Sequence, residues 1–98
     1  MISNDLLYRC LNPDLTEEEA IQLAHELEKI YDELTPLEIA YIQINQKLCI
    51  IQFSLFHSAV EKVLEQPVFT HEFGFQSIVD QMKYYINQKW EDHKSYDF

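Results

Sequence analysis

Histidines that precede a glutamate are the first residues in this sequence that suggest chemistry. His25 and His71 are each followed by glutamate, as at the start of a zinc-binding HExxH helix. That motif needs a second histidine four residues after the first, so that both imidazoles face one metal ion. Lys29 and Phe75 stand at those positions instead. We therefore predict no metal site.

His57 is the histidine best placed to act as a general base, because it lies in an apolar segment where burial could shift its titration. A catalytic base also needs a positioned partner, and the sequence indicates none. Gly74 is the only glycine, which excludes the glycine-rich loops that cradle phosphates, and no GxSxG motif is present. We predict neither a cofactor nor catalytic residues.

The two cysteines, Cys10 and Cys49, lie far apart in the sequence and form no CxxC pair. Cys49 stands in the apolar run 48–51, where a buried thiol behaves as a small hydrophobic group. We expect Cys49 to be buried. The chain is not a disulfide scaffold, although a single disulfide between the two cysteines stays open.

The net charge excludes several kinds of partner. The 98 residues include 17 acidic and 7 basic side chains, a formal charge of −10. Direct binding to nucleic acid or to an anionic membrane needs Lys and Arg to neutralise phosphate, so neither is expected. No stretch approaches the roughly 18 uninterrupted apolar residues of a membrane helix, and residues 1–5 do not begin a signal peptide. These features predict a cytoplasmic protein.

Most of the excess charge lies near the N-terminus. Residues 1–38 hold 10 acidic and 2 basic side chains, whereas residues 39–98 hold 7 and 5. A helix is expected over 17–34, and an outer stripe on it includes Glu18, Glu26 and Glu33. We assign these three residues to partner binding. Such a stripe suits a partner protein with a basic surface, and a solvated helix face is the alternative interpretation.

Aromatic residues are concentrated near the C-terminus. One face of a single helix cannot bury all of Tyr84, Tyr85, Trp90, Tyr96 and Phe98. Tyr and Trp are favoured interface anchors because they bring a large contact area at low entropic cost. We therefore also assign Tyr84 and Trp90 to partner binding. The alternative is that Tyr85 and Trp90 cover the core while the other rings lie outside it.

Helices must position these residues, because one glycine and three prolines leave few places for the tight turns of a β-sandwich or barrel. A short N-terminal helix is expected over about 5–11, before Pro13. Thr16 and Glu19 form a capping box at the start of a helix over 17–34, in which apolar residues recur every three or four positions.

Thr35 and Glu38 repeat this capping signal, and neither Gly nor Pro occurs between Glu38 and Pro67. We predict one long central helix over 36–65. It is apolar around most of its circumference and must therefore be covered on several sides. The rival interpretation is a β-hairpin over 39–53, because both halves of that segment are β-prone.

A last helix is expected over 75–93, after an irregular connector, and residues 95–98 are expected to fray. The sequence thus predicts a single domain, 1–98, with an all-α fold. In this small helical bundle, helices 17–34 and 75–93 flank the central helix 36–65. Because the central helix has more apolar surface than two amphipathic helices easily cover, it could also form a homodimer.

We weigh three functional hypotheses. The first is a non-enzymatic protein-binding module, an acidic inhibitor or regulator that docks on a basic partner surface. The second is a structural or assembly subunit that self-associates through the central helix and the C-terminal aromatic residues. The third, and the least favoured, is a small enzyme that uses His57.

Overall fold

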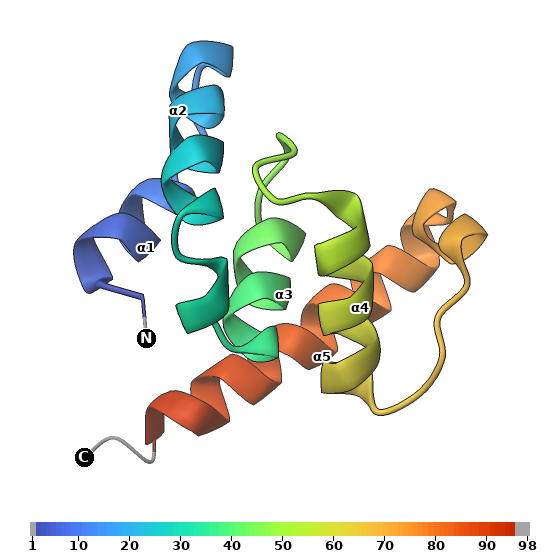
Figure 1. Cartoon of the computed structure of the whole chain (residues 1–98). Helices are drawn as coiled ribbons and strands as arrows, with labels where there is room; N and C mark the ends of the chain where they lie inside the picture. Colours follow the sequence, from blue (N-terminus) through green and yellow to red (C-terminus); the bar gives the residue numbers. More distant parts are fainter. Residues whose placement is uncertain (1, 96–98) are drawn as a thin grey trace.

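The computed structural model describes residues 2–95, which form five α-helices and two short 3₁₀ helices and contain no strand (Figure 1). In chain order the elements are α1 (Asn4–Cys10), α2 (Glu17–Glu28), η1 (Tyr31–Glu33), α3 (Pro36–Ile44), α4 (Phe53–Leu64), η2 (Thr70–Gly74) and α5 (Gln76–Ser95). The all-α fold class is confirmed, and the rival hairpin over 39–53 is wrong. Tyr96, Phe98 and most of the tail that was expected to fray lie outside the described residues.

Side-chain caps precede the first two helices, and α2 begins where its capping box predicts. At the start of α1, the Ser3 hydroxyl accepts a hydrogen bond from the Leu6 N–H (3.2 Å). At α2, the Thr16 hydroxyl accepts from the Glu19 N–H (3.2 Å), and the Glu19 carboxylate accepts from the Thr16 N–H (3.0 Å). These contacts satisfy backbone donors that the first turn of a helix leaves without a partner.

The second helix is shorter than the predicted helix over 17–34. It ends at Glu28, and Ile30 leaves the helical conformation with φ −121° and ψ 14°. The 3₁₀ turn η1 follows, and Leu34 after it is extended and buried. The chain bends here to bring Leu34 into the core before α3 begins, so the prediction of one continuous helix is wrong.

The predicted central helix over 36–65 is also divided in two. α3 ends at Ile44 and α4 begins at Phe53, with an irregular loop over 45–52 between them. The loop lets α4 fold back beside α3, and these two helices form the most extensive contact between elements in the described part of the chain. The apolar side chains of α3 and α4 were expected to point outward from one long helix. In the structure, apolar side chains of the two helices face each other instead.

A glutamine side chain accounts for the break. The side-chain oxygen of Gln43 accepts hydrogen bonds from the Ile50 and Ile51 N–H groups (2.9 and 3.0 Å). Its amide nitrogen donates to the Leu48 carbonyl (3.0 Å). Backbone groups that a continuous helix would have paired are thus satisfied in the loop by one side chain, which removes the usual cost of leaving a helix.

Two further amides fasten the loop to distant helices. Gln46 is buried, and its nitrogen donates to the Cys10 and Asn12 carbonyls at the end of α1 (2.8 and 3.0 Å). Asn45 donates to the Asn87 side chain on α5 (2.8 Å) and accepts from it (3.3 Å). The loop over 45–52 is therefore a junction between both ends of the chain.

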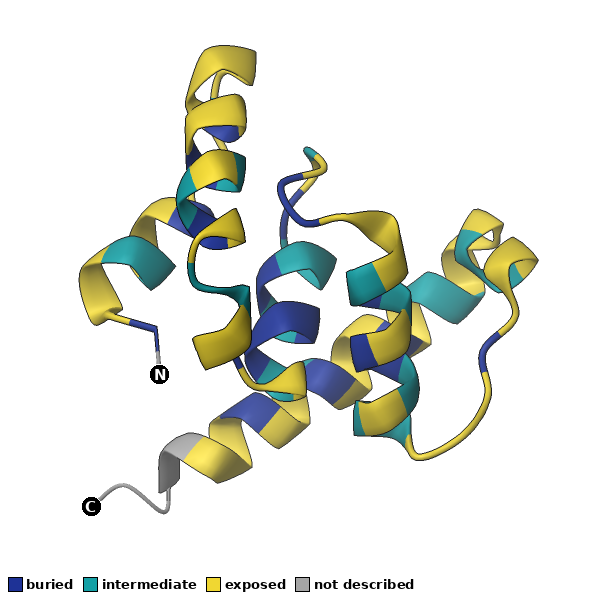
Figure 2. Cartoon of the chain, viewed as in Figure 1, coloured by how far each residue is buried: buried dark blue, intermediate teal, exposed yellow. Residues whose placement is uncertain are grey.

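The core lies around α3, which is in contact with α4 and α5 (Figure 2). The most deeply buried large side chains come from α2, α3, the loop, α4 and α5: Leu23, Leu27, Ile42, Ile50, Ile51, Val60 and Ile86. The radius of gyration is 13.0 Å, as expected for a compact chain of about 100 residues. Apolar side chains that were expected on the surface of one long central helix are thus covered within one molecule.

The last helix matches its prediction. α5 begins at Gln76 and turns Met82, Ile86 and Trp90 toward the rest of the molecule. Phe75, which directly precedes this helix, is largely exposed. None of the helices between residues 2 and 95 combines the length and the apolar character needed to cross a membrane.

Candidate functional site

The outer side of α2 combines acidic side chains with one apolar side chain. The helix buries three residues on its other side: Ala20, Leu23 and Leu27. Glu17, Ile21 and Glu28 follow one another at spacings of four and seven residues, which places them on one stripe. Ile21 is 60% exposed, and Glu17, Glu18 and Glu28 around it are exposed as well (Figure 2). This acidic side of α2, Glu17, Glu18, Ile21 and Glu28, is the first candidate surface.

Glu26, which was assigned to partner binding, is tied to α1. The two terminal guanidinium nitrogens of Arg9 donate to the two carboxylate oxygens of Glu26 (3.3 and 2.7 Å). The hydrogen bond from Arg9 lowers the pKa of Glu26, and the same contact raises the pKa of Arg9. Glu26 therefore joins two helices, and a partner would have to compete with Arg9 for it.

The other two predicted acidic residues are not neighbours on one helix. Glu18 is exposed in the first turn of α2, whereas Glu33 belongs to η1, beyond the end of that helix. The predicted stripe of three glutamates is therefore not brought together. The stripe through Ile21 was not predicted, although one signal was present: Ile21 lies outside the three- and four-residue spacing that relates Ala20, Leu23 and Leu27.

The two aromatic residues assigned to partner binding lie in different environments. Tyr84 is 70% exposed, whereas Trp90 is 7% exposed. The Trp90 indole stacks on the Tyr41 ring of α3, with ring centroids 4.2 Å apart and planes within 6°. Burial also raises the pKa of Tyr41. Trp90 therefore fastens α5 to α3, and only Tyr84 of the two lies open to a partner.

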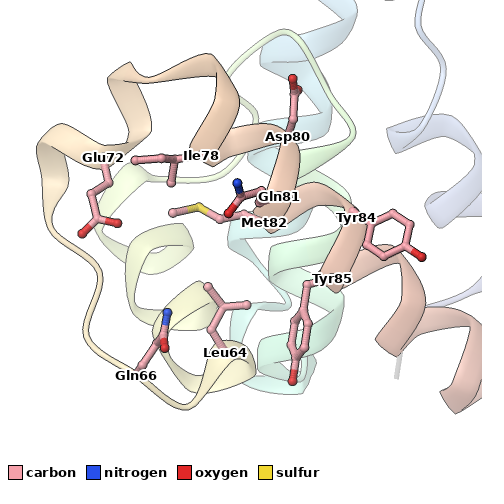
Figure 3. A pocket seen from close by; sticks show the side chains of 9 residues that line it. All are labelled: Leu64, Gln66, Glu72, Ile78, Asp80, Gln81, Met82, Tyr84 and Tyr85. Carbon is pink, nitrogen blue, oxygen red and sulfur yellow. The ribbon is translucent and has the colours of Figure 1, made fainter.

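A groove lies between the end of α4, η2 and the first turns of α5 (Figure 3). Its volume is about 830 Å³. The lining includes apolar, amide and acidic side chains: Leu64, Ile78, Met82, Tyr84 and Tyr85; Gln66 and Gln81; Glu72 and Asp80. No basic side chain of the described residues lines it. This α4–α5 groove is the second candidate surface.

Exposed aromatic rings surround η2, beside this groove. Phe69 is 64% exposed and Phe75 is 54% exposed. The His71 ring lies between them, stacked on Phe69 at 5.8 Å and edge-on to Phe75 at 6.3 Å. This segment was expected to be only an irregular connector. The signal available there was the density of aromatic residues without helical spacing.

His57 has a structural partner in the chain itself. Its Nε2 atom is hydrogen-bonded to the Val68 carbonyl, and it lies 3.9 Å from the Glu61 carboxylate. Glu61 in turn accepts from the Val68 N–H (2.9 Å). These two residues of α4 hold both backbone groups of Val68, so their polar atoms fasten the segment that leads to η2.

The two cysteines are free thiols in different settings. Cys10 is fully buried, and burial raises the pKa of its thiol to about 11. Cys49 is exposed and donates to the Ile51 carbonyl (3.2 Å). The prediction that Cys49 is buried is wrong, because the loop over 45–52 replaces the expected helix there. Within residues 2–95, no group of three His, Cys, Asp or Glu side chains is arranged to hold a metal ion.

The two candidate surfaces are thus an acidic helix side and an open groove. Known proteins add no further information about their role. Comparison of the chain with protein-family models, with curated proteins and with solved structures found no match.

Proposed function

We propose that this chain is a non-enzymatic protein-binding module of the cytoplasm, an inhibitor or regulator that docks through α2 on a basic partner surface. The observation that carries the proposal is the acidic side of α2, where exposed glutamates surround the exposed Ile21. Charges of one sign steer a partner of the opposite sign and orient it, and the apolar contact then adds burial. Two free cysteines fit a reducing compartment.

The position of this surface also supports docking. Residues 1–38 carry a net charge of −8, and Arg9 neutralises Glu26 rather than the exposed glutamates. α2 rests on the core through one side only, as Figure 2 shows. A partner can therefore cover the outer side without disturbing a buried residue.

A pair of charge-reversal variants tests the proposal. Glu18→Lys/Glu28→Lys changes the acidic side of α2, and the control Asp5→Lys/Asp92→Lys makes the same change in net charge elsewhere. Each tagged protein is incubated with a native cell extract at low and at high salt, and bound proteins are identified by mass spectrometry. We expect the wild type and the control to retain a common basic partner that high salt releases, and the α2 variant to lose it.

Ile21→Ala gives an independent check of the same surface. Removing an exposed side chain at an interface centre should weaken capture while circular dichroism shows unchanged helix content. The proposal is wrong if the α2 variant captures the same proteins as the wild type at low salt. It is also wrong if both charge variants lose them equally.

A second candidate is an assembly subunit that forms a homodimer through its C-terminal half. The exposed rings of Phe69, Phe75 and Tyr84 favour it, whereas the charge of −10 on each copy opposes it at low ionic strength. It predicts self-association that strengthens as salt is added and weakens in Phe69→Ser/Phe75→Ser. Light scattering over a concentration series measures this, and a monomer at every salt concentration would rule it out.

A further inference from the structure

The α4–α5 groove has an apolar floor that the chain itself does not fill. Figure 3 shows Leu64 from the end of α4 facing Met82, with Tyr85 beside them on α5. Ile78 continues the apolar lining toward η2. Met82 is 5% exposed and belongs to the core, so the floor is rigidly backed.

The edge of the groove is negative. Glu72 on η2 and Asp80 on α5 are among its lining residues, and Figure 3 shows Asp80 on the outer side of α5. α4 ends at the groove, and the C-terminus of a helix carries a partial negative charge. Lys62 and Lys83 are exposed and are not part of the lining, and the ammonium group of Lys89 lies 5.4 Å from the centroid of the Tyr85 ring at the end of the groove away from Glu72.

These features define the chemistry of an occupant. Between residues 2 and 95 there is no strand edge, so an incoming segment finds no backbone ladder with which to pair. A segment that satisfies its own N–H and C=O groups, an α-helix, suits such a groove. Apolar residues on one side of that helix match Leu64, Met82 and Tyr85, and flanking Lys or Arg match the acidic edge.

We propose that the α4–α5 groove binds an amphipathic helix of another protein, with apolar residues at i and i+3 or i+4 flanked by Lys or Arg. A second copy of this chain is a poorer occupant, because it holds 17 acidic side chains against 7 basic ones and would bring like charge to the groove. The groove lies by η2 and α5, on the opposite side of Figure 1 from the upper turns of α2. It is therefore a surface separate from the acidic side of α2.

A library of displayed helical peptides, about 16 residues long, provides the probe. The full chain is immobilised, and binders are selected and then depleted against the Glu72→Gln/Asp80→Asn variant. Both substitutions remove charge but keep an acceptor for the Phe69 N–H and for the Gln76 amide, which these side chains contact. We expect the enriched peptides to carry apolar residues at helical spacing with basic residues beside them.

Affinities of one enriched peptide then separate the groove from the rest of the surface. We expect binding to weaken about fivefold in Glu72→Gln/Asp80→Asn and about tenfold in Tyr85→Ala. The control Asp14→Asn/Asp92→Asn removes the same charge away from the groove and should leave affinity unchanged. Amide shifts in the NMR spectrum of the wild-type chain should map to Leu64, Ile78 and Met82, whether or not Tyr85→Ala folds fully.

Three results with the peptides would overturn the inference. They are enriched peptides that are acidic or lack helical spacing, amide shifts that fall on α2 or on no defined surface, and equal loss of affinity in the control variant. A dimer whose formation protects the groove residues would also overturn it, in favour of a second copy. None of these experiments uses an α2 variant, so failure here leaves the proposed function untouched, and the reverse holds as well.

Discussion

Gln43 shows how one side chain can set the path of the backbone. The residue lies in the last turn of α3, at a position that helical periodicity assigns to a polar outer sector. Its amide instead turns to Leu48, Ile50 and Ile51 and takes the place of helical hydrogen bonds. Nothing in the local sequence distinguishes a solvated glutamine from one that serves a loop five to eight residues later.

Replacing Gln43 by alanine should therefore destabilise the fold. The Ile50 and Ile51 N–H groups would lose their acceptor next to buried side chains, at a cost of about 2 kcal/mol in the free energy of unfolding. Gln22→Ala, on the exposed side of α2, is the matched control and should change stability by less than about 0.5 kcal/mol. Urea titrations followed by circular dichroism compare the two, and equal midpoints would show that the Gln43 contacts are dispensable.

The two thiols should differ in reactivity and in their response to pH. Because Cys10 is fully buried and its pKa is raised to about 11, N-ethylmaleimide at pH 8 should modify only Cys49 in the native protein. Cys49→Ser should then react only after denaturation.

The raised pKa of the Cys10 thiol also stabilises the fold below the unfolded pKa of 9.0. This contribution should fade as pH rises from 9.0 toward about 11. Urea titrations over this pH range should show a smaller loss of stability in Cys10→Ala than in the wild type. Rapid labelling of Cys10 in the native protein would contradict the burial of its thiol.

At the scale of elements, the helix starts marked by a capping box could be predicted, whereas the ends of α2 and α3 and the start of α4 could not. Each of the two capping boxes, one at Thr16 and one at Thr35, spans only four consecutive residues. Both form as predicted. After the end of α3, Gln46 donates to the Cys10 carbonyl, 36 residues away in the sequence. A prediction made from local spacing had no access to that contact, and it therefore joined α3 to α4.

The capping box has an exposed glutamate in α2 and a buried one in α3, and substituting each glutamate gives a matched pair of variants. Glu19 caps α2 at the surface, whereas Glu38 is 5% exposed and accepts from the Thr35 N–H (2.9 Å) and the Ile2 N–H (3.0 Å). We expect Glu38→Ala to cost about 2–3 kcal/mol, because the buried Ile2 N–H and the part-buried Thr35 N–H lose their acceptor. Glu19→Ala should cost about 0.5–1 kcal/mol, as expected for a solvated cap. Thermal and urea unfolding measure both, and costs of equal size would show that the contact with Ile2 adds nothing.

At the scale of the whole molecule, the fold decides which predicted contact groups remain available. Most of the excess charge belongs to residues 1–38, but the Arg9 contact uses Glu26, and Glu33 lies on η1, beyond the end of the helix that carries Glu18. The α4–α5 groove could not be anticipated, because it exists only where α4 turns back after the loop. Both surfaces therefore depend on tertiary contacts that spacing within one helix does not show.

The stack of Trp90 on Tyr41 should make the molecule unfold as one unit. α5 is in contact with α3 and α4, and Trp90 extends this packing to the last turns of the helix. Trp90→Ala should therefore cost about 3 kcal/mol, a large share of the roughly 5–15 kcal/mol that stabilises a domain of this size. Tyr84→Ala, on the exposed side of the same helix, should cost less than about 0.5 kcal/mol.

In the wild type, the fluorescence of Trp90 and the far-ultraviolet circular dichroism should change at the same urea concentration, as in a two-state transition. An earlier change in fluorescence would mean that the end of α5 detaches before the rest of the bundle unfolds, and that Trp90 contributes to a local contact only.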